Sequence, residues 1–166
     1  MKKLTLDEYV HNYYLEHKSD QLGIFFDALL NVYGFTPQEA QDLFLDSKYP
    51  DLIDDNDATV ILGLSGLNLY NKIQWSDTHR DIDYDLYDKS RYFYKSEEYW
   101  AGWILAYYQD HTQRTFQEIF QHLPLETIIG YYYPYHEADV SKSYSIFDAY
   151  FQDEKTTGKE EERNDQ

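Results

Sequence analysis

The sequence predicts an all-α protein: a compact bundle of roughly six to eight short helices around a central helix rich in tyrosine and tryptophan, with a disordered acidic C-terminal tail. Two observations lead to this fold class. Apolar residues recur at three- and four-residue spacing along most of the chain, which is the period of an amphipathic helix. Thr36 and Thr115 are each followed three residues later by a glutamate, which is a helix-capping pattern.

Three helices are expected in the first part of the chain. Two apolar stripes predict two successive N-terminal helices, of which the second closes at Gly34. These stripes consist of Leu6, Tyr9, Val10, Tyr13 and Tyr14, and of Leu22, Phe25, Phe26, Leu29 and Leu30. Thr36 can cap a third helix, because Pro37 suits its first position and Glu39 completes a capping box.

Residues 58–75 have the gross outline of a helix-turn-helix. A turn-rich acidic stretch leads into a short helix from about Ala58, a break follows at Gly63 to Gly66, and a second helix is expected from Leu67 to Ile73. The local charge argues against DNA reading, because four aspartates precede this segment and Lys72 is the nearby cation. A packed helical corner is therefore favoured over a DNA-reading motif.

Residues 76–95 lack a helical stripe and alternate charged with apolar side chains, so a loop or a short edge strand is expected there. The aspartates at positions 81, 83, 85 and 88 resemble the start of a calcium loop. The glycine and the glutamate that such a loop needs at its sixth and twelfth positions are missing. A solvated acidic loop is the better interpretation.

Four helices are expected in the second part of the chain. Ser96 can cap the central helix, and Thr115 with Glu118 makes a capping box for the next one. A short helix lies between Pro124 in its first turn and Gly130 at its end. The last helix begins near Asp139, with a stripe made by Val140, Tyr144, Phe147 and Phe151.

The composition predicts one helical domain over residues 1–152 and a disordered charged tail over residues 153–166, which contains no apolar residue. The formal net charge is −17, which disfavours nucleic acid and acidic membrane surfaces as partners. There is no cysteine, and the N-terminal lysines are followed by Asp7 and Glu8 before any apolar run, so no export signal is expected. Apolar runs fall short of the ~20 residues that cross a bilayer. A cytoplasmic protein is expected.

No catalytic constellation can be nominated from motifs. The six histidines are scattered, and the chain has no nucleophile elbow, Walker loop or dinucleotide-binding glycine pattern, so no cofactor is expected. His136 and Asp139 would face the same way on a helix and could share a metal, but position 140 is valine and no third ligand is apparent. We expect instead that Glu137 and Asp139 cap the last helix while His136 bonds into the turn after Pro134.

The central helix contains the segment YWAGWILAYYQ at residues 99–109. Its apolar arc extends around most of the helix, which predicts that other helices pack on several sides. Gly102 is unfavourable in an exposed helix, so a neighbouring backbone is expected to cross closely there. A core helix is favoured, and an aromatic pocket or a groove for a partner is the alternative. The candidate functional cluster for that pocket is Tyr99, Trp100, Trp103, Tyr107, His136, Glu137 and Asp139.

Three segments carry a resemblance to a known family: GLSGLNL near residue 66, KSEEYWAGWILAYYQDHTQRTFQEIF at 95–120, and YPYHEADV at 133–140. Together they resemble an uncharacterised all-helical family of Firmicutes bacteria with a YW-x-GW-x-LAYYQ motif. Its members are encoded near small ADP-ribosyltransferase-like toxins, which implies an antitoxin or accessory role. The family tends to have a tryptophan where this chain has Asp110. No catalytic residue is carried over from it.

Three function classes follow. The leading hypothesis is a non-enzymatic cytosolic binding protein, antitoxin-like or regulatory, whose partner is another protein, such as a toxin encoded nearby. The second class is related to DNA: the protein is either a regulator that reads DNA through residues 58–75 or an acidic inhibitor that imitates DNA. The third is an enzyme whose pocket is formed by the Tyr/Trp helix with His136, Glu137 and Asp139. The oligomeric state is left open.

Overall fold

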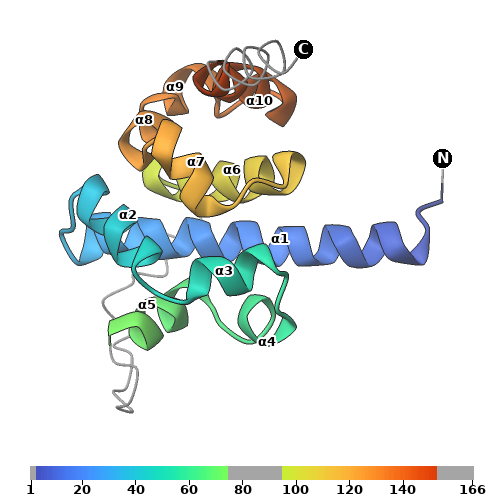
Figure 1. Cartoon of the computed structure of the whole chain (residues 1–166), viewed down its shortest axis with the longest axis horizontal. Coiled ribbons are helices and arrows are strands. Elements are labelled where there is room, and N and C mark those ends of the chain that lie inside the picture. The colour runs from blue at the N-terminus through green and yellow to red at the C-terminus, as the bar shows by residue number, and fades with distance from the viewer. Residues whose placement is uncertain (1–2, 75–94, 153–166) are drawn as a thin grey trace, which may run out of the picture.

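The computed structural model describes residues 3–74 and 95–152, and in this part of the chain every regular element is helical, which confirms the all-α fold class (Figure 1). The elements in chain order are α1 (Leu6–Asp27), the π-helical stretch η1 (Ala28–Val32), α2 (Pro37–Leu45), α3 (Tyr49–Asp54), α4 (Ala58–Ile61), α5 (Gly66–Gln74), α6 (Glu97–Thr112), α7 (Phe116–His122), α8 (Leu125–Gly130), α9 (Tyr132–Tyr135), α10 (Val140–Asp148) and the 3₁₀ turn η3 (Ala149–Phe151).

Helix α1 runs along the longest axis of the molecule and separates two groups of helices (Figure 1). Helices α3, α4 and α5 lie on one side of it, and α6 to α10 lie on the other. Helix α6 packs on α1 along its length and also contacts α8, α9 and α10. The Tyr/Trp-rich helix therefore has neighbours on several sides, as the apolar arc predicts. The predicted loop or edge strand from residue 76, its calcium-like aspartates, and the predicted tail 153–166 lie outside the described residues.

The prediction of two N-terminal helices is wrong, because residues 6–27 form one continuous helix of 22 residues. The polar stretch between the two apolar stripes suggested a break. In the structure Lys18 and Gln21 from this stretch are buried and bonded to distant partners, so the helix continues through them. The predicted helix end at Gly34 is confirmed. Gly34 follows the end of η1 and has a positive φ of 74°.

Most of the predicted helix starts are confirmed at the level of side-chain bonds. The two predicted capping boxes, Thr36 with Glu39 and Thr115 with Glu118, both form in full. Ser96 accepts a bond from an amide of α6, and Asp139 accepts one from an amide of α10. A further capping box, made by Thr5 and Glu8, begins α1.

The structure contains two short helices that the sequence pattern did not indicate. Helix α3 occupies the turn-rich acidic stretch, where Pro50 lies in its first turn. Helix α9 is a single turn between α8 and α10. Pro124 was expected inside the first turn of α8 but is its N-cap residue. Helices of one or two turns carry too few apolar residues to show a period, which is why they escape prediction.

Two glycines let helices cross α1 at close range. A Cβ added to Gly102 of α6 would lie 2.2 Å from the Leu22 carbonyl oxygen of α1. A Cβ on Gly66, the first residue of α5, would lie 2.5 Å from the Gln21 carbonyl oxygen. Both distances are shorter than atoms can approach, so each crossing requires glycine. The predicted close backbone approach at Gly102 is confirmed, with α1 as the crossing partner.

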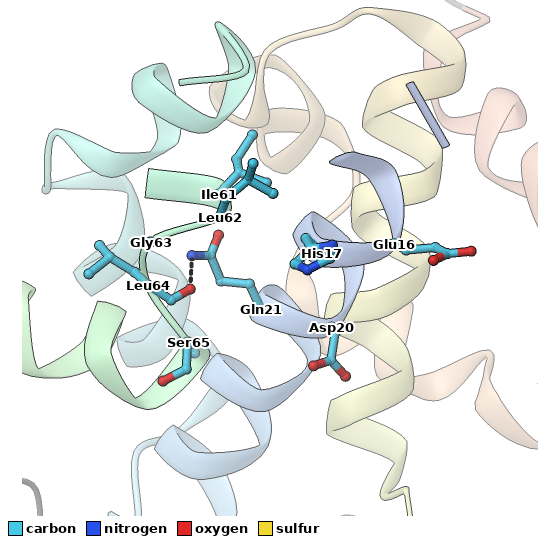
Figure 2. A pocket seen from close by; sticks show the side chains of 10 residues that line it. Glu16, His17, Asp20, Gln21, Ile61, Leu62, Gly63, Leu64 and Ser65 are labelled. Atoms are coloured by element: carbon cyan, nitrogen blue, oxygen red, sulfur yellow. Dashed lines mark hydrogen bonds between the residues drawn. The ribbon is translucent and has the colours of Figure 1, made fainter. Parts of the chain in front are cut away.

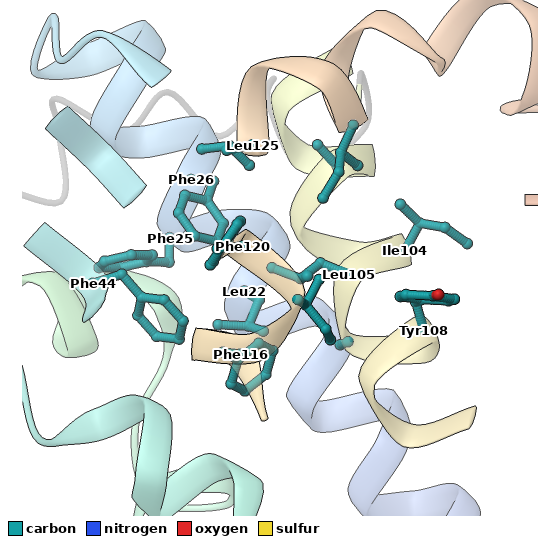
Figure 3. Packing of buried hydrophobic residues seen from close by; sticks show 14 of the residues in the cluster. Leu22, Phe25, Phe26, Phe44, Ile104, Leu105, Tyr108, Phe116, Phe120 and Leu125 are labelled. Carbon is teal, nitrogen blue, oxygen red and sulfur yellow. The ribbon is translucent and has the colours of Figure 1, made fainter. Parts of the chain in front are cut away.

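The core between these helices is rich in phenylalanine (Figure 3). Phe44 of α2 is fully buried, and its ring centroid lies 5.6 Å from that of Phe25, 5.7 Å from that of Phe26 and 5.3 Å from that of Phe116. These rings come from α1, α2 and α7, so one cluster joins three helices that are distant in sequence. Aromatic pairs at this spacing contribute beyond the area that they bury.

Within the described ranges, no helix combines the length and the apolar character needed to cross a membrane.

Candidate functional site

An aromatic pocket lies between the start of α6 and α9. Its volume is about 320 Å³, and it is lined by Lys95, Tyr99, Trp100, Trp103, Tyr132 and His136.

Stacked rings form the walls of this aromatic pocket. The Trp100 and Tyr132 rings meet edge to face with centroids 5.9 Å apart, and the His136 ring stacks on Tyr132 at 4.2 Å. His136 is fixed in this position because its Nδ1 lies 2.9 Å from the Tyr132 carbonyl oxygen. The bond therefore reaches back to a residue before Pro134, and not into the turn after Pro134 as predicted.

The structure brings part of the predicted cluster together. Tyr99, Trp100, Trp103 and His136 line the aromatic pocket. Tyr107 lies one turn further along α6, with its ring 4.4 Å from that of Trp103, and does not line the pocket.

The two predicted carboxylates lie elsewhere. The Glu137 side chain is 89% exposed, and its carboxylate is 3.7 Å from His136 Nε2. Asp139 caps α10, and the bonds from Ser141 lower the pKa of its carboxyl. Neither is among the residues that line the aromatic pocket, so the structure does not place them there with the Tyr/Trp helix.

The polar groups of the aromatic pocket are already engaged with one another. The Tyr99 hydroxyl accepts a bond of 2.7 Å from Lys95 Nζ and donates one to the Asp20 carboxylate. The Lys95 ammonium also lies 4.1 Å from the centroid of the Tyr99 ring. The pocket thus offers flat apolar walls with an ammonium and an imidazole at its edge, which suits packing of an apolar or aromatic group.

In the part of the chain that the structure describes, no three histidine, aspartate or glutamate side chains come close enough together to hold an ion.

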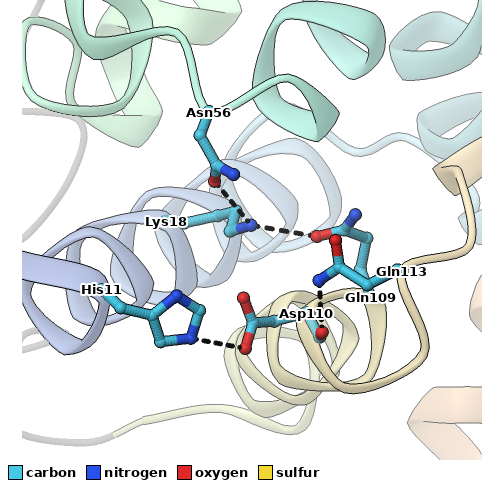
Figure 4. A network of polar contacts seen from close by, with 6 residues as sticks. All are labelled: His11, Lys18, Asn56, Gln109, Asp110 and Gln113. Carbon is cyan, nitrogen blue, oxygen red and sulfur yellow. Dashed lines mark hydrogen bonds and ion pairs between the residues drawn. The ribbon is translucent and has the colours of Figure 1, made fainter. Parts of the chain in front are cut away.

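A second cluster, which the sequence did not indicate, surrounds the buried Lys18 of α1 (Figure 4). Its ammonium donates to Gln109 Oε1 at 2.9 Å and to Asn56 Oδ1 at 3.3 Å. Beside it, Asp110 Oδ2 lies 3.0 Å from His11 Nε2. The Asp110 side chain thereby joins α6 to α1.

Burial dominates the electrostatics of this cluster. Desolvation lowers the pKa of Lys18, although the carboxylates of Asp110 and Asp54 act in the opposite direction. Burial likewise raises the pKa of Asp54 to about 7. The hydrogen bond from the Phe116 amide and the charge of Lys18 lower this pKa, but burial has the larger effect. One carboxyl oxygen of Asp54 is buried without a hydrogen-bond partner, which also disfavours its charged form.

Replacement of Asp54 by asparagine is expected to stabilise the protein at pH 8 by about 1 kcal/mol and to change little at about pH 4. The pKa of Asp54 is about 7 in the folded state against an ordinary value of 3.8, so the folded state holds the proton more tightly. Stability from this group is therefore lost as pH rises from about 4 to 7. Urea unfolding at both pH values measures the difference, with the exposed neighbour Asp55→Asn as control. An equal effect of both substitutions would refute the assignment.

The N-terminal part of α1 extends beyond the ends of the other helices (Figure 1). Four apolar side chains on this part are exposed, and we call them the overhang face: Leu6 (76% exposed), Tyr9 (59%), Val10 (45%) and Tyr13 (43%). They recur at three- and four-residue spacing, so they form one continuous stripe. The first predicted apolar stripe thus lies at the surface and is not part of the core.

A groove of about 460 Å³ adjoins the overhang face, and we call it the overhang groove. It is lined by Leu6, Asp7, Val10, His11, Tyr14, Leu15, Asn56 and Asp110. One wall is therefore apolar and belongs to α1. The other wall is polar and includes the turn at Asn56, next to the aspartates at positions 54, 55 and 57.

The corner between α4 and α5 corresponds to the predicted helix-turn-helix (Figure 2). Gln21 of α1 holds it by donating to the carbonyl oxygens of Val60 and Leu64 at 2.9 and 2.7 Å. A pocket of about 360 Å³ lies beside this contact, with Glu16, His17 and Asp20 on its α1 side. Helix α4 is a single turn, and α5 begins against α1 through Gly66. DNA reading by residues 58–75 stays a prediction, since a packed corner also accounts for this arrangement.

Comparison with known proteins adds no family to this description. No family model, no curated protein and no solved structure matches the chain significantly.

Proposed function

We propose that this protein is a non-enzymatic cytosolic binding protein whose partner is another protein, in an antitoxin-like or regulatory role. The observation that carries the proposal is the overhang face. A continuous apolar stripe that projects from the body of a protein is typical of an interaction surface, because exposed apolar patches are otherwise avoided. The adjoining overhang groove adds a concave surface beside this stripe.

The aromatic pocket gives weaker support to an enzymatic role. Its Tyr99 hydroxyl is held by Lys95 and Asp20, and the two carboxylates proposed to act with it lie outside the pocket. A general acid or base must lie within hydrogen-bond reach of the reacting group. Packing of an apolar group is the role that this lining favours.

Co-purification tests the proposed function. The protein, with a tag at its C-terminal end so that α1 is unmodified, is expressed in its source cells, and bound proteins are identified by mass spectrometry. We expect one protein to co-purify in a fixed ratio. The product of a neighbouring gene is the first candidate, and co-expression should relieve any growth arrest that it causes. Recovery of no partner, together with no protection, would contradict the proposal.

A further inference from the structure

We infer that the overhang face and overhang groove bind a basic amphipathic helix of the partner protein. This inference rests on the proposed protein-binding function and adds the chemistry of the partner segment. Its apolar side chains would pack on Leu6, Val10 and Tyr14, and its lysines or arginines would face the acidic rim of the groove.

The shape of the surface favours a helix. The overhang face covers residues 6–13, a length of about 12 Å on a helix. A straight apolar stripe of this kind is complementary to the apolar face of another helix, which is a common mode of peptide recognition. The groove beside the stripe has space for side chains of such a segment.

The charge of the rim selects a basic partner. Asp7 and Asp110 line the overhang groove, where Asp110 pairs with His11, and the exposed Asp55 adjoins Asn56 of the lining in the sequence. Lys18 is buried, and its ammonium is bonded to amide oxygens of Asn56 and Gln109. Complementary charges would speed association and disfavour acidic partners.

The same charges disfavour two other occupants. A second copy of this chain would bring identical carboxylates to the interface and carries the same formal net charge of −17. An anionic membrane surface would be repelled by the acidic rim in the same way. A basic helix is the occupant that satisfies both the apolar stripe and the charge.

A synthetic helical peptide of leucine and lysine, labelled with fluorescein, serves as the probe in fluorescence anisotropy with the full chain. We expect binding that is lost when the lysines are replaced by glutamate or when the sequence is scrambled to remove the apolar face. Leu6→Gln with Val10→Gln should weaken binding about tenfold, because glutamine keeps the helix but removes the stripe. The matched control is Leu62→Gln with Tyr133→Gln, which changes exposed apolar residues elsewhere.

A second pair of variants tests the rim. Asp7→Asn with Asp55→Asn should weaken binding and reduce its salt dependence, whereas Asp42→Asn on α2 with Asp46→Asn at its C-cap should do neither. Absence of binding to the leucine–lysine peptide, or equal weakening by test and control variants, would overturn the inference. So would a dimer, measured by light scattering, that Leu6→Gln with Val10→Gln abolishes. If the natural partner still co-purifies with that double variant, the surface is wrong while the proposed function stands.

Discussion

Replacement of Gly102 by alanine is expected to destabilise the protein by about 3 kcal/mol or more, or to prevent folding. The new Cβ would lie 2.2 Å from the Leu22 carbonyl oxygen and 2.5 Å from its carbonyl carbon. Both atoms belong to the backbone of α1, so no side-chain rotation can relieve the contact. Helices α1 and α6 would have to separate along their extensive interface. Urea unfolding followed by circular dichroism measures the loss.

The matched control for this change is Gly130→Ala. Gly130 is the last residue of α8, and a Cβ added there meets no atom within 4 Å. Alanine should therefore leave stability within about 1 kcal/mol of the original, because only the helix propensity changes. Similar effects of the two substitutions would show that the close crossing of α1 and α6 is not what Gly102 provides.

Replacement of Phe44 by alanine is expected to lower the free energy of unfolding by about 3–5 kcal/mol. Phe44 is fully buried and joins α2 to rings of α1 and α7, so its removal leaves a cavity where three helices meet. Phe44→Leu should have a smaller effect because it fills part of this space.

Two probes reveal whether this cluster and α6 belong to one cooperative unit. Circular dichroism follows all helices, whereas tryptophan fluorescence includes Trp100 and Trp103 of α6, away from Phe44. In a single unit the urea transitions of Phe44→Ala coincide for both probes. A loss below about 1 kcal/mol would contradict the burial of Phe44, and separated transitions would contradict a single domain.

The fold class was predictable from the sequence because most helices carry a local signal. The capping boxes at Thr36 and Thr115 depend on residues three positions apart, and both form. The continuity of α1 was not predictable in this way. Lys18 is bonded to Gln109, which is 91 residues away, and no local pattern shows that a polar stretch will find such a partner.

The candidate site was predicted only in part, because the sequence reveals residues that are neighbours on one helix but not those that come from distant segments. Tyr99, Trp100 and Trp103 follow one another on a helix, and His136 was added because of its chemistry. Tyr132 completes the aromatic pocket, yet nothing in the sequence distinguishes it from the other 18 tyrosines of the chain, which has 19 in all. The overhang face was visible as a stripe, but a stripe alone does not say whether a helix side meets the core or the solvent.

The buried polar side chains of α1 have a consequence for the alignment of the helix. An apolar stripe in an apolar groove can slide by one turn, about 5.4 Å, and still bury a similar area. Such a slide would take Lys18 away from Gln109 and Gln21 away from the carbonyl groups of Val60 and Leu64. Each buried group left without a partner would cost about 1–3 kcal/mol. Lys18 and Gln21 therefore select one register of α1 among several that the apolar contacts alone would allow.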